Sequence, residues 1–257
     1  MGKIFWALLK KELLEQWRTY RLLIAVVVFL ILGISGPIIT KLTPDLLSNL
    51  GQGITIILPP QTAKDALNSY LKNMLQLAPL AFILLAMGCV ADERSRGTAV
   101  TTLTKPVPRA IFVLAKFCAY ELTLILSITL SAASTYYYTS LLFSALPLGA
   151  FCILNLALLL LLSISLAFTI LASTCFRNAI AAGGLAFVGT IALLLLPNFS
   201  SAITQALPSV LFNANRVSQL LAGSTALLDI LKPLLIGTGL VAIFAALACL
   251  IFQQQEL

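Results

Sequence analysis

Charged side chains, the residue types able to form ion pairs or assist a reaction, gather in one stretch of this sequence. Only 10% of the 257 residues are charged, yet positions 91–116 hold seven of them: Asp92, Glu93, Arg94, Arg96, Lys105, Arg109 and Lys116. The acidic pair stands at an expected helix start, where negative charge is favourable. Gly97 and Thr98 permit a change of direction, and Pro106 and Pro108 prevent one continuous helix. The pattern favours a short docking helix between two bends over the alternative, a solvated connector.

Residue types that catalyse reactions or bind metals are scarce. The chain has no histidine, the commonest general base and metal ligand. Its five cysteines are odd in number and widely spaced, which fits neither a disulfide framework nor a metal site. Neither G-x-S-x-G nor G-x-x-x-x-G-K-[ST] occurs. We therefore expect no catalytic, cofactor-binding or metal-binding residues, and any nucleotide energy must come from another chain.

Two kinds of polar residue interrupt an apolar run that begins at Phe117. Glu121 is a carboxylate well inside this run, where an unpaired charge would cost roughly 2.5–3.5 kcal/mol. Ser127 and Ser131 belong to a stripe of hydroxyls at helical spacing. Such stripes usually join helices in lipid, and a partner for Glu121 is expected on another helix or subunit. Lining of a translocation path is the alternative for all three residues.

The first 21 residues predict an amphipathic helix that lies at the membrane surface. On a helical wheel, Phe5, Leu9 and Leu13 fall in one sector with Trp6 and Trp17. The opposite sector is mainly basic, and Leu8 and Gln16 blur the division. A basic helix with two tryptophans suits the headgroup layer and could also contact a partner; a basic flank without a further role is the alternative. The residues of interest are Trp6, Lys10, Lys11, Glu12, Trp17 and Arg18.

Composition places the rest of the chain in a membrane. Hydrophobic residues make up 60% of the sequence, and the mean hydropathy is +1.03. The net charge of +7 does not indicate nucleic acid, because basic residues flank membrane spans and no basic–aromatic module is present. We predict an all-α integral membrane protein with six transmembrane helices. They are Leu22–Thr40, Met74–Ala91, Phe117–Tyr138, Leu148–Cys175, Ala179–Pro197 and Pro233–Phe252.

The distribution of lysine and arginine predicts the orientation. With the N-terminus inside, eleven basic residues fall on the cytoplasmic side and five outside, so both termini are expected in the cytoplasm. Residues 1–257 are predicted to form a single transmembrane domain. Within it, 1–21 is the interfacial helix and 92–116 the cytoplasmic loop. Residues 198–231 are too apolar for a free loop and too broken to span, which predicts short helices dipping into the outer leaflet.

The stretch DERSRGTAVTTLTKPVPRAIFVLAKF resembles the loop after the second span in ABC transporter permeases of the type-2 export family. The matching positions are Glu93, Arg94, Gly97, Thr98, Pro106, Arg109 and Lys116. The N-terminal KKELLEQWR is similar to the start of such permeases, and the six-span layout agrees over the whole chain. The long segment between the first two expected spans is a departure.

The resemblance implies a fold and a mechanism. It implies that residues 92–116 contain a coupling helix docked on a separate ATPase subunit, and that two permease copies or paralogues assemble with two ATPases. ATP and Mg²⁺ would bind that subunit, so this chain would not itself be an enzyme. An exporter in the plasma membrane of a prokaryotic cell is then expected. A secondary transporter or channel is the alternative; an intramembrane enzyme is disfavoured because nucleophile–base pairs and metal ligands are missing.

Overall fold

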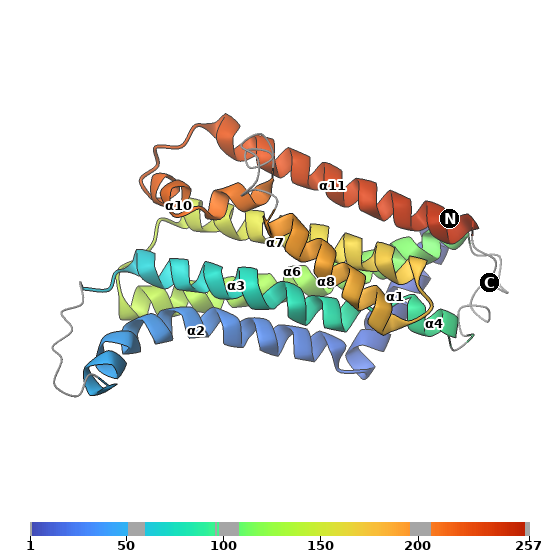
Figure 1. Ribbon diagram of the computed structural model, residues 1–257, viewed down its shortest axis with the longest axis horizontal. Helices are drawn as coiled ribbons and strands as arrows, with labels where there is room; N and C mark the ends of the chain where they lie inside the picture. The colour runs from blue at the N-terminus through green and yellow to red at the C-terminus, as the bar shows by residue number, and fades with distance from the viewer. Residues whose placement is uncertain (1, 51–59, 96, 98–107, 196–206, 255–257) are drawn as a thin grey trace.

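The protein is a bundle of long α-helices (Figure 1). The computed structural model describes residues 2–50, 60–95, 97, 108–195 and 207–254, with only the backbone of 45–50. Within these residues the regular structure is entirely helical, which confirms the predicted all-α class. The long helices are α2 (Arg21–Leu50), α3 (Ala63–Ala86), α6 (Arg109–Leu142), α7 (Leu148–Cys175), α8 (Ala179–Leu195) and α11 (Leu227–Gln254).

Five segments of the described chain are long and apolar enough to cross a bilayer. They comprise α2, α3 with the short helix that follows it, α6, α7 and α11. Helix α8 is apolar but has only 17 described residues, about 25 Å at 1.5 Å per residue. The sixth span therefore stays a prediction, although α8 packs along α7, where a further span would lie (Figure 1).

Several helices begin before the apolar runs that predicted them. Helix α3 starts at Ala63, ahead of the apolar run from Met74, because Thr62 and Asp65 form a capping box at its N-terminus. Helix α6 begins at Arg109 and α11 at Leu227, ahead of the predicted starts at Phe117 and Pro233. Hydropathy marks the part of a helix that lipid surrounds, whereas hydrogen bonding continues the helix into the polar regions on either side.

Some prolines lie inside these helices and others lie at helix starts. Pro79 lies inside α3, and Pro37 lies inside α2. Pro108 and Pro147 occupy the N-cap positions of α6 and α7, where a missing N–H costs no helical hydrogen bond. Only the last two positions therefore act as helix boundaries.

The core of the bundle is built on close contacts of α2 with α3 and α6. Ser131 and Thr135 of α6 donate hydrogen bonds to the backbone oxygens of Phe29 and Gly33, at 2.8 and 3.0 Å. A Cβ on Gly36 would come within 2.8 Å of the Tyr70 backbone in α3. Small residues and hydroxyls thus allow the helices to approach closely, as in other membrane bundles. Ser131 thus bonds across two helices, while its alternative place along a path stays a prediction.

The two ends of the bundle differ in their short elements (Figure 1). One end has α1 (Gly2–Arg18), α4 (Ala91–Ser95), the start of α6 and the end of α11. The opposite end has the 3-10 helix η2 (Pro208–Phe212) and α10 (Ala214–Leu221). The predicted segment 198–231 thus does contain short helices. It ends before position 231, however, because α11 begins at Leu227. Residues 198–206 of that segment lie outside the described part.

Candidate functional site

A buried lysine joins three helices at the end of the bundle that carries α1 and α4. The Nζ of Lys116 in α6 donates to Glu12 Oε2 in α1 at 2.9 Å and to Glu93 Oε1 in α4 at 2.7 Å. The side chains of Lys116 and Glu12 are only 2% and 5% exposed, and that of Glu93 is 14% exposed. We call Glu12, Glu93 and Lys116, together with Lys11 and Glu15, the charged node. It ties together segments more than 100 residues apart in sequence.

The outer edge of the charged node is formed by α1. Lys11 Nζ lies 3.2 Å from Glu12, 3.4 Å from Glu93 and 3.7 Å from Glu15, and its side chain is 43% exposed. Partial burial lowers the pKa of Lys11, while the carboxylates of Glu12 and Glu93 raise it, and the net result is a pKa above the usual value. This ammonium therefore stays charged throughout the physiological pH range.

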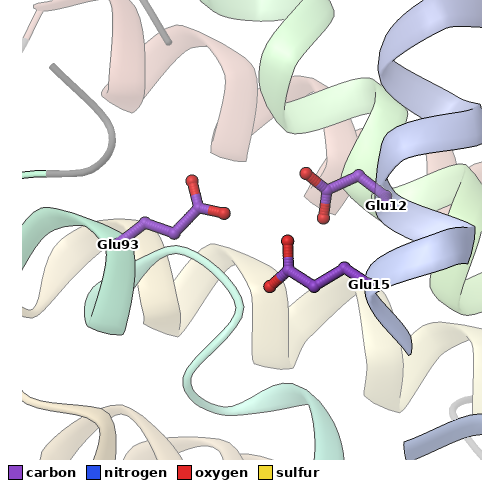
Figure 2. Close-up of side chains that lie close together, drawn as sticks. All are labelled: Glu12, Glu15 and Glu93. Atoms are coloured by element: carbon purple, nitrogen blue, oxygen red, sulfur yellow. The ribbon is translucent and has the colours of Figure 1, made fainter. Parts of the chain in front are cut away.

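The three carboxylates of the node point toward one another (Figure 2). Oxygens of Glu12, Glu15 and Glu93 lie within 4.8 Å of each other, a spacing that a divalent cation could accept. The Lys116 ammonium, however, contacts two of these carboxylates and the Lys11 ammonium contacts all three. The negative charge is thus balanced by lysine, and the arrangement is better suited to fixing helices than to binding a metal.

Aromatic packing covers the inner side of the node. The Lys116 ammonium lies 5.0 Å from the centroid of the Phe112 ring, within the range of a cation–π contact. Phe112 stacks on Phe252 near the end of α11, with centroids 5.5 Å apart. Both rings are almost completely buried. The ion pairs are therefore shielded from water on this side, and α11 joins the same cluster.

Further polar contacts seat α1 and the start of α2 on α6. Thr123 Oγ1 donates to Gln16 Oε1 at 2.5 Å, and both side chains are buried. Arg21, the first residue of α2, donates to the Tyr120 hydroxyl at 2.9 Å. Helix α1 therefore turns Leu8, Leu9, Glu12 and Gln16 toward the protein. Trp6 and Trp17 are 68% and 64% exposed on another face.

Helix α4 is fixed to the end of α7. The backbone N–H groups of Val90 and Ala91 donate to Ser173 Oγ at 3.1 and 3.0 Å, which supplies acceptors at the start of α4. Arg94 Nη1 donates to the Thr174 backbone oxygen at 2.9 Å. Gly97 has a φ of +71°, a conformation that glycine adopts readily and that suits a turn after α4; residues 98–107 lie outside the described part.

The predicted partner-contact residues take different places. Glu93 and Lys116 form the node, Arg94 binds α7, and Arg109 donates to the Gln253 backbone oxygen at 3.2 Å. Asp92 lies in the first turn of α4 and is partly exposed. The other predicted contacts lie outside the described residues: Arg96, Thr98 and Pro106. Burial of Lys116 changes its interpretation, because its ammonium can reach a partner only if the node opens.

Of the interfacial-helix residues, Trp6, Lys10, Trp17 and Arg18 are exposed and Lys11 is partly so. Glu12 faces the protein instead, which the helical wheel did not reveal. Helix α1 therefore has three faces rather than the two that the wheel predicted. One face packs on the bundle, one carries the exposed tryptophans, and one is basic.

The candidate path residues make contacts within this chain. Ser163 Oγ of α7 donates to Glu121 Oε1 at 2.5 Å, so a neutral hydroxyl of another helix contacts this carboxylate. Ser127 is completely buried and donates to the Thr123 backbone oxygen in its own helix at 2.8 Å. Glu121 is thus bonded across two helices, Ser127 bonds within its own helix, and a path along them stays a prediction.

Comparison with known proteins adds the family. Residues 6–257 match the model of the ABC-2 family transporter proteins. The chain is also 29% identical, over 144 residues, to the uncharacterized transmembrane protein YxlG of Bacillus subtilis (strain 168). That alignment covers 55% of this chain and 56% of YxlG, so the chain spans about half the length of this curated relative. Since the family match includes nearly the whole chain and all three helices of the charged node, this multi-pass membrane protein belongs to the ABC-2 transporter family.

Proposed function

We propose that this chain is the membrane-spanning permease subunit of an ATP-driven exporter, and that a separate ATPase subunit acts on it at α4. The observation that supports this most is the charged node, which fixes α4 to both α1 and α6 through Lys116. Membership of the ABC-2 family implies association with an ABC ATPase component. A copy number of two permeases and two ATPases, with ATP and Mg²⁺ on the ATPase, is part of the proposal.

The contacts of α4 suggest how force would spread. A displacement of α4 would act on α7 through Ser173 and Arg94, and on α1 and α6 through the contacts of Glu93 with Lys11 and Lys116. Short, buried ion pairs resist stretching, because separating them leaves charges without partners in a medium of low dielectric. The node would therefore transmit motion of the motor to several helices together, and these would open the path alternately to the two sides of the membrane.

Co-purification tests the proposal. The tagged permease is extracted from its native membrane, and mass spectrometry searches the eluate for a subunit with the G-x-x-x-x-G-K-[ST] phosphate loop. We expect such a subunit, and we expect Asp92→Lys in α4 to remove most of it because the change reverses a partly exposed charge beside the node. Asp229→Lys is the matched control at the opposite end of the bundle and should retain the ATPase.

Reconstitution then separates this function from a secondary transporter. In proteoliposomes, the permease should increase or regulate ATP hydrolysis by the co-purified subunit, and Asp92→Lys should abolish that effect. A permease that purifies without an ATPase and moves solute on an ion gradient alone would contradict the proposal. Loss of the subunit from both charge-reversal variants would point to misfolding rather than to a lost contact at α4.

A further inference from the structure

Glu121 places a carboxyl group inside the membrane-spanning part of α6. It lies about 18 Å from the start of this helix at 1.5 Å per residue, and both α6 and the neighbouring α7 are long and apolar enough to span a bilayer. Glu121 Oε2 is buried and has no hydrogen-bond partner among the described residues. Oε1 has a bond to Ser163 of α7. One oxygen of this carboxyl is thus bonded and the other is not.

The contacts of Ser163 do not fit an ionised Glu121. Ser163 Oγ lies 2.5 Å from Glu121 Oε1 and 2.9 Å from the backbone oxygen of Leu159. A hydroxyl has one proton to donate, whereas a carboxylate and a backbone carbonyl have none. If Glu121 is ionised, Ser163 donates to it, and the contact with Leu159 then holds two oxygens together without a proton. A protonated Glu121 supplies the missing proton, because it can donate to Ser163 while Ser163 donates to Leu159.

The neighbouring helices bring no cation to this position. Among the described residues, Glu121 forms no ion pair. Helix α7 contains no charged residue. The charges of α11, Asp229 and Lys232, lie near its start, and those of α3 lie within its first ten residues. Both of these helix starts are at the end of the bundle that carries α10 (Figure 1). A negative charge on Glu121 would therefore be buried without compensation.

Cations close to Glu121 in sequence or along α6 face other directions. Lys116 is about 140° around the helix at 100° per residue, and it binds α1 and α4 instead. Arg21 of α2 donates to the hydroxyl of Tyr120, about 100° away from Glu121. Cys118, one turn before Glu121, is a titratable neighbour on the same side, but a thiol cannot balance a negative charge. A neutral Glu121 needs no such balance.

The partly exposed side of Glu121 faces the same direction as apolar side chains. Leu114 and Ile125, seven residues before and four residues after Glu121, share its side of α6. Their exposed fractions are 41% and 36%, and Glu121 itself is partly exposed. In a bilayer this surface meets hydrocarbon. An apolar reagent dissolved in the membrane therefore reaches the carboxyl, whereas a charged reagent in water does not.

We propose that Glu121 is a neutral carboxylic acid inside the membrane, that it donates its proton to Ser163, and that an apolar carbodiimide modifies this chain there. In that reaction the acid proton moves to a carbodiimide nitrogen, and the carboxyl oxygen bonds to the central carbon to give an O-acylisourea. The acyl group then migrates from oxygen to nitrogen and forms a stable N-acylurea. No group leaves, so the protein gains the full mass of the reagent. The inference is independent of any ATPase.

Infrared difference spectroscopy of the full-length protein in lipid vesicles tests the protonation. At neutral pH, the spectrum of the wild type minus that of Glu121→Gln should contain the carbonyl band of a neutral acid and no carboxylate bands. Ser163→Ala should keep this band and move it to higher wavenumber, because the acid O–H loses its acceptor. Ser165→Ala is the matched control, since Ser165 donates to a backbone oxygen within α7, and it should leave the band unchanged.

Dicyclohexylcarbodiimide tests the reactivity of the wild-type protein in the same vesicles. An ordinary hydrated carboxyl, with a pKa of about 4, is protonated in roughly one molecule in a thousand at pH 7. Glu15 and Asp229 are 42% and 48% exposed, and each contacts a cation. Peptide mass spectrometry should therefore show at least about tenfold more adduct on Glu121 than on either of them. A carbodiimide that carries a charge should leave Glu121 unmodified.

Three results would overturn the proposal. Carboxylate bands in place of the acid band would show that Glu121 is ionised. An acid band without an adduct on Glu121 would remove the modification site. Equal modification of Glu121 and Asp229 would show that protonation does not select the reacting group. Size-exclusion profiles identify any variant that misfolds, and the labelling experiment needs no variant. Because neither assay contains an ATPase, failure of this inference would leave the proposed transport role untouched.

Discussion

Lys116 is a charged side chain in a place from which water is almost excluded. Burial of an ammonium and a carboxylate costs several kcal/mol for each ion, and only close pairing with good hydrogen bonds offsets that cost. Here the distances of 2.9 and 2.7 Å to Glu12 and Glu93 meet that condition. The pair need not add net stability, but removal of one member leaves an uncompensated buried charge. The charged node therefore contributes specificity, because it favours one arrangement of α1, α4 and α6 over others.

The Lys116→Met variant should therefore be strongly destabilised. We expect a loss of about 3–5 kcal/mol in the free energy of unfolding, because Glu12 would remain buried without its main partner. Thermal unfolding of the protein purified in detergent measures this change. Adding Glu12→Gln to Lys116→Met should recover part of the loss, since the double variant has one fewer unpaired charge.

Lys10→Met is the matched control for that experiment, because Lys10 is an exposed lysine in α1. We expect it to change stability by no more than about 0.5 kcal/mol, as for most surface substitutions. Equal stabilities of Lys116→Met and Lys10→Met would show that the node does not fix the three helices.

At the scale of helices, the sequence predicted the apolar segments well, but it did not predict the polar contacts between helices. The bounds Leu148–Cys175 of α7 were predicted correctly, because both ends of this run meet clear breaks in hydropathy. The wheel of α1 missed the inward side of Glu12, since its partner lies 104 residues away and leaves no local periodicity. The same holds for Ser173, which accepts bonds from the start of α4 across 82 and 83 residues. The hydrophobic periodicity of a helix indicates which of its faces meet water or lipid. It does not identify partners that are distant in the sequence.

Packing between helices makes a sharp prediction at Gly36. Gly36→Ala should lower stability, because its Cβ would meet the backbone of Tyr70 at 2.8 Å and backbone atoms cannot rotate away. Gly184→Ala is the matched control: nothing lies within 4 Å of the added Cβ in α8, and alanine favours a helix by up to about 1 kcal/mol over glycine. The melting temperature should fall for Gly36→Ala and stay level or rise for Gly184→Ala. A similar fall in both variants would argue against close packing of α2 on α3.

At the scale of the whole molecule, α8 decides the topology. Its 17 described residues reach about 25 Å, short of the roughly 30 Å hydrocarbon layer, but a bilayer can thin locally around a short helix at modest cost. Arg109 hydrogen-bonds to Gln253 near the end of α11, so the start of α6 and the end of α11 lie on the same side of the membrane. An even number of crossings between them follows. Helices α6, α7 and α11 alone would make three crossings, so α8 is predicted to supply the fourth. The count of basic residues then predicts which side this is.

Labelling in intact cells tests both the crossing of α8 and the orientation. In a background with the five native cysteines replaced by alanine, Ser95→Cys marks α4 and Asn215→Cys marks α10; both positions are exposed. A membrane-impermeant maleimide should label Asn215→Cys from outside and Ser95→Cys only after the cells are opened. This result requires three crossings between the two positions, through α6, α7 and α8. Labelling of both positions from the same side would mean that α8 does not span. Labelling of Ser95→Cys alone from outside would place α4 where no cytoplasmic ATPase can reach it, and the proposed coupling would be wrong.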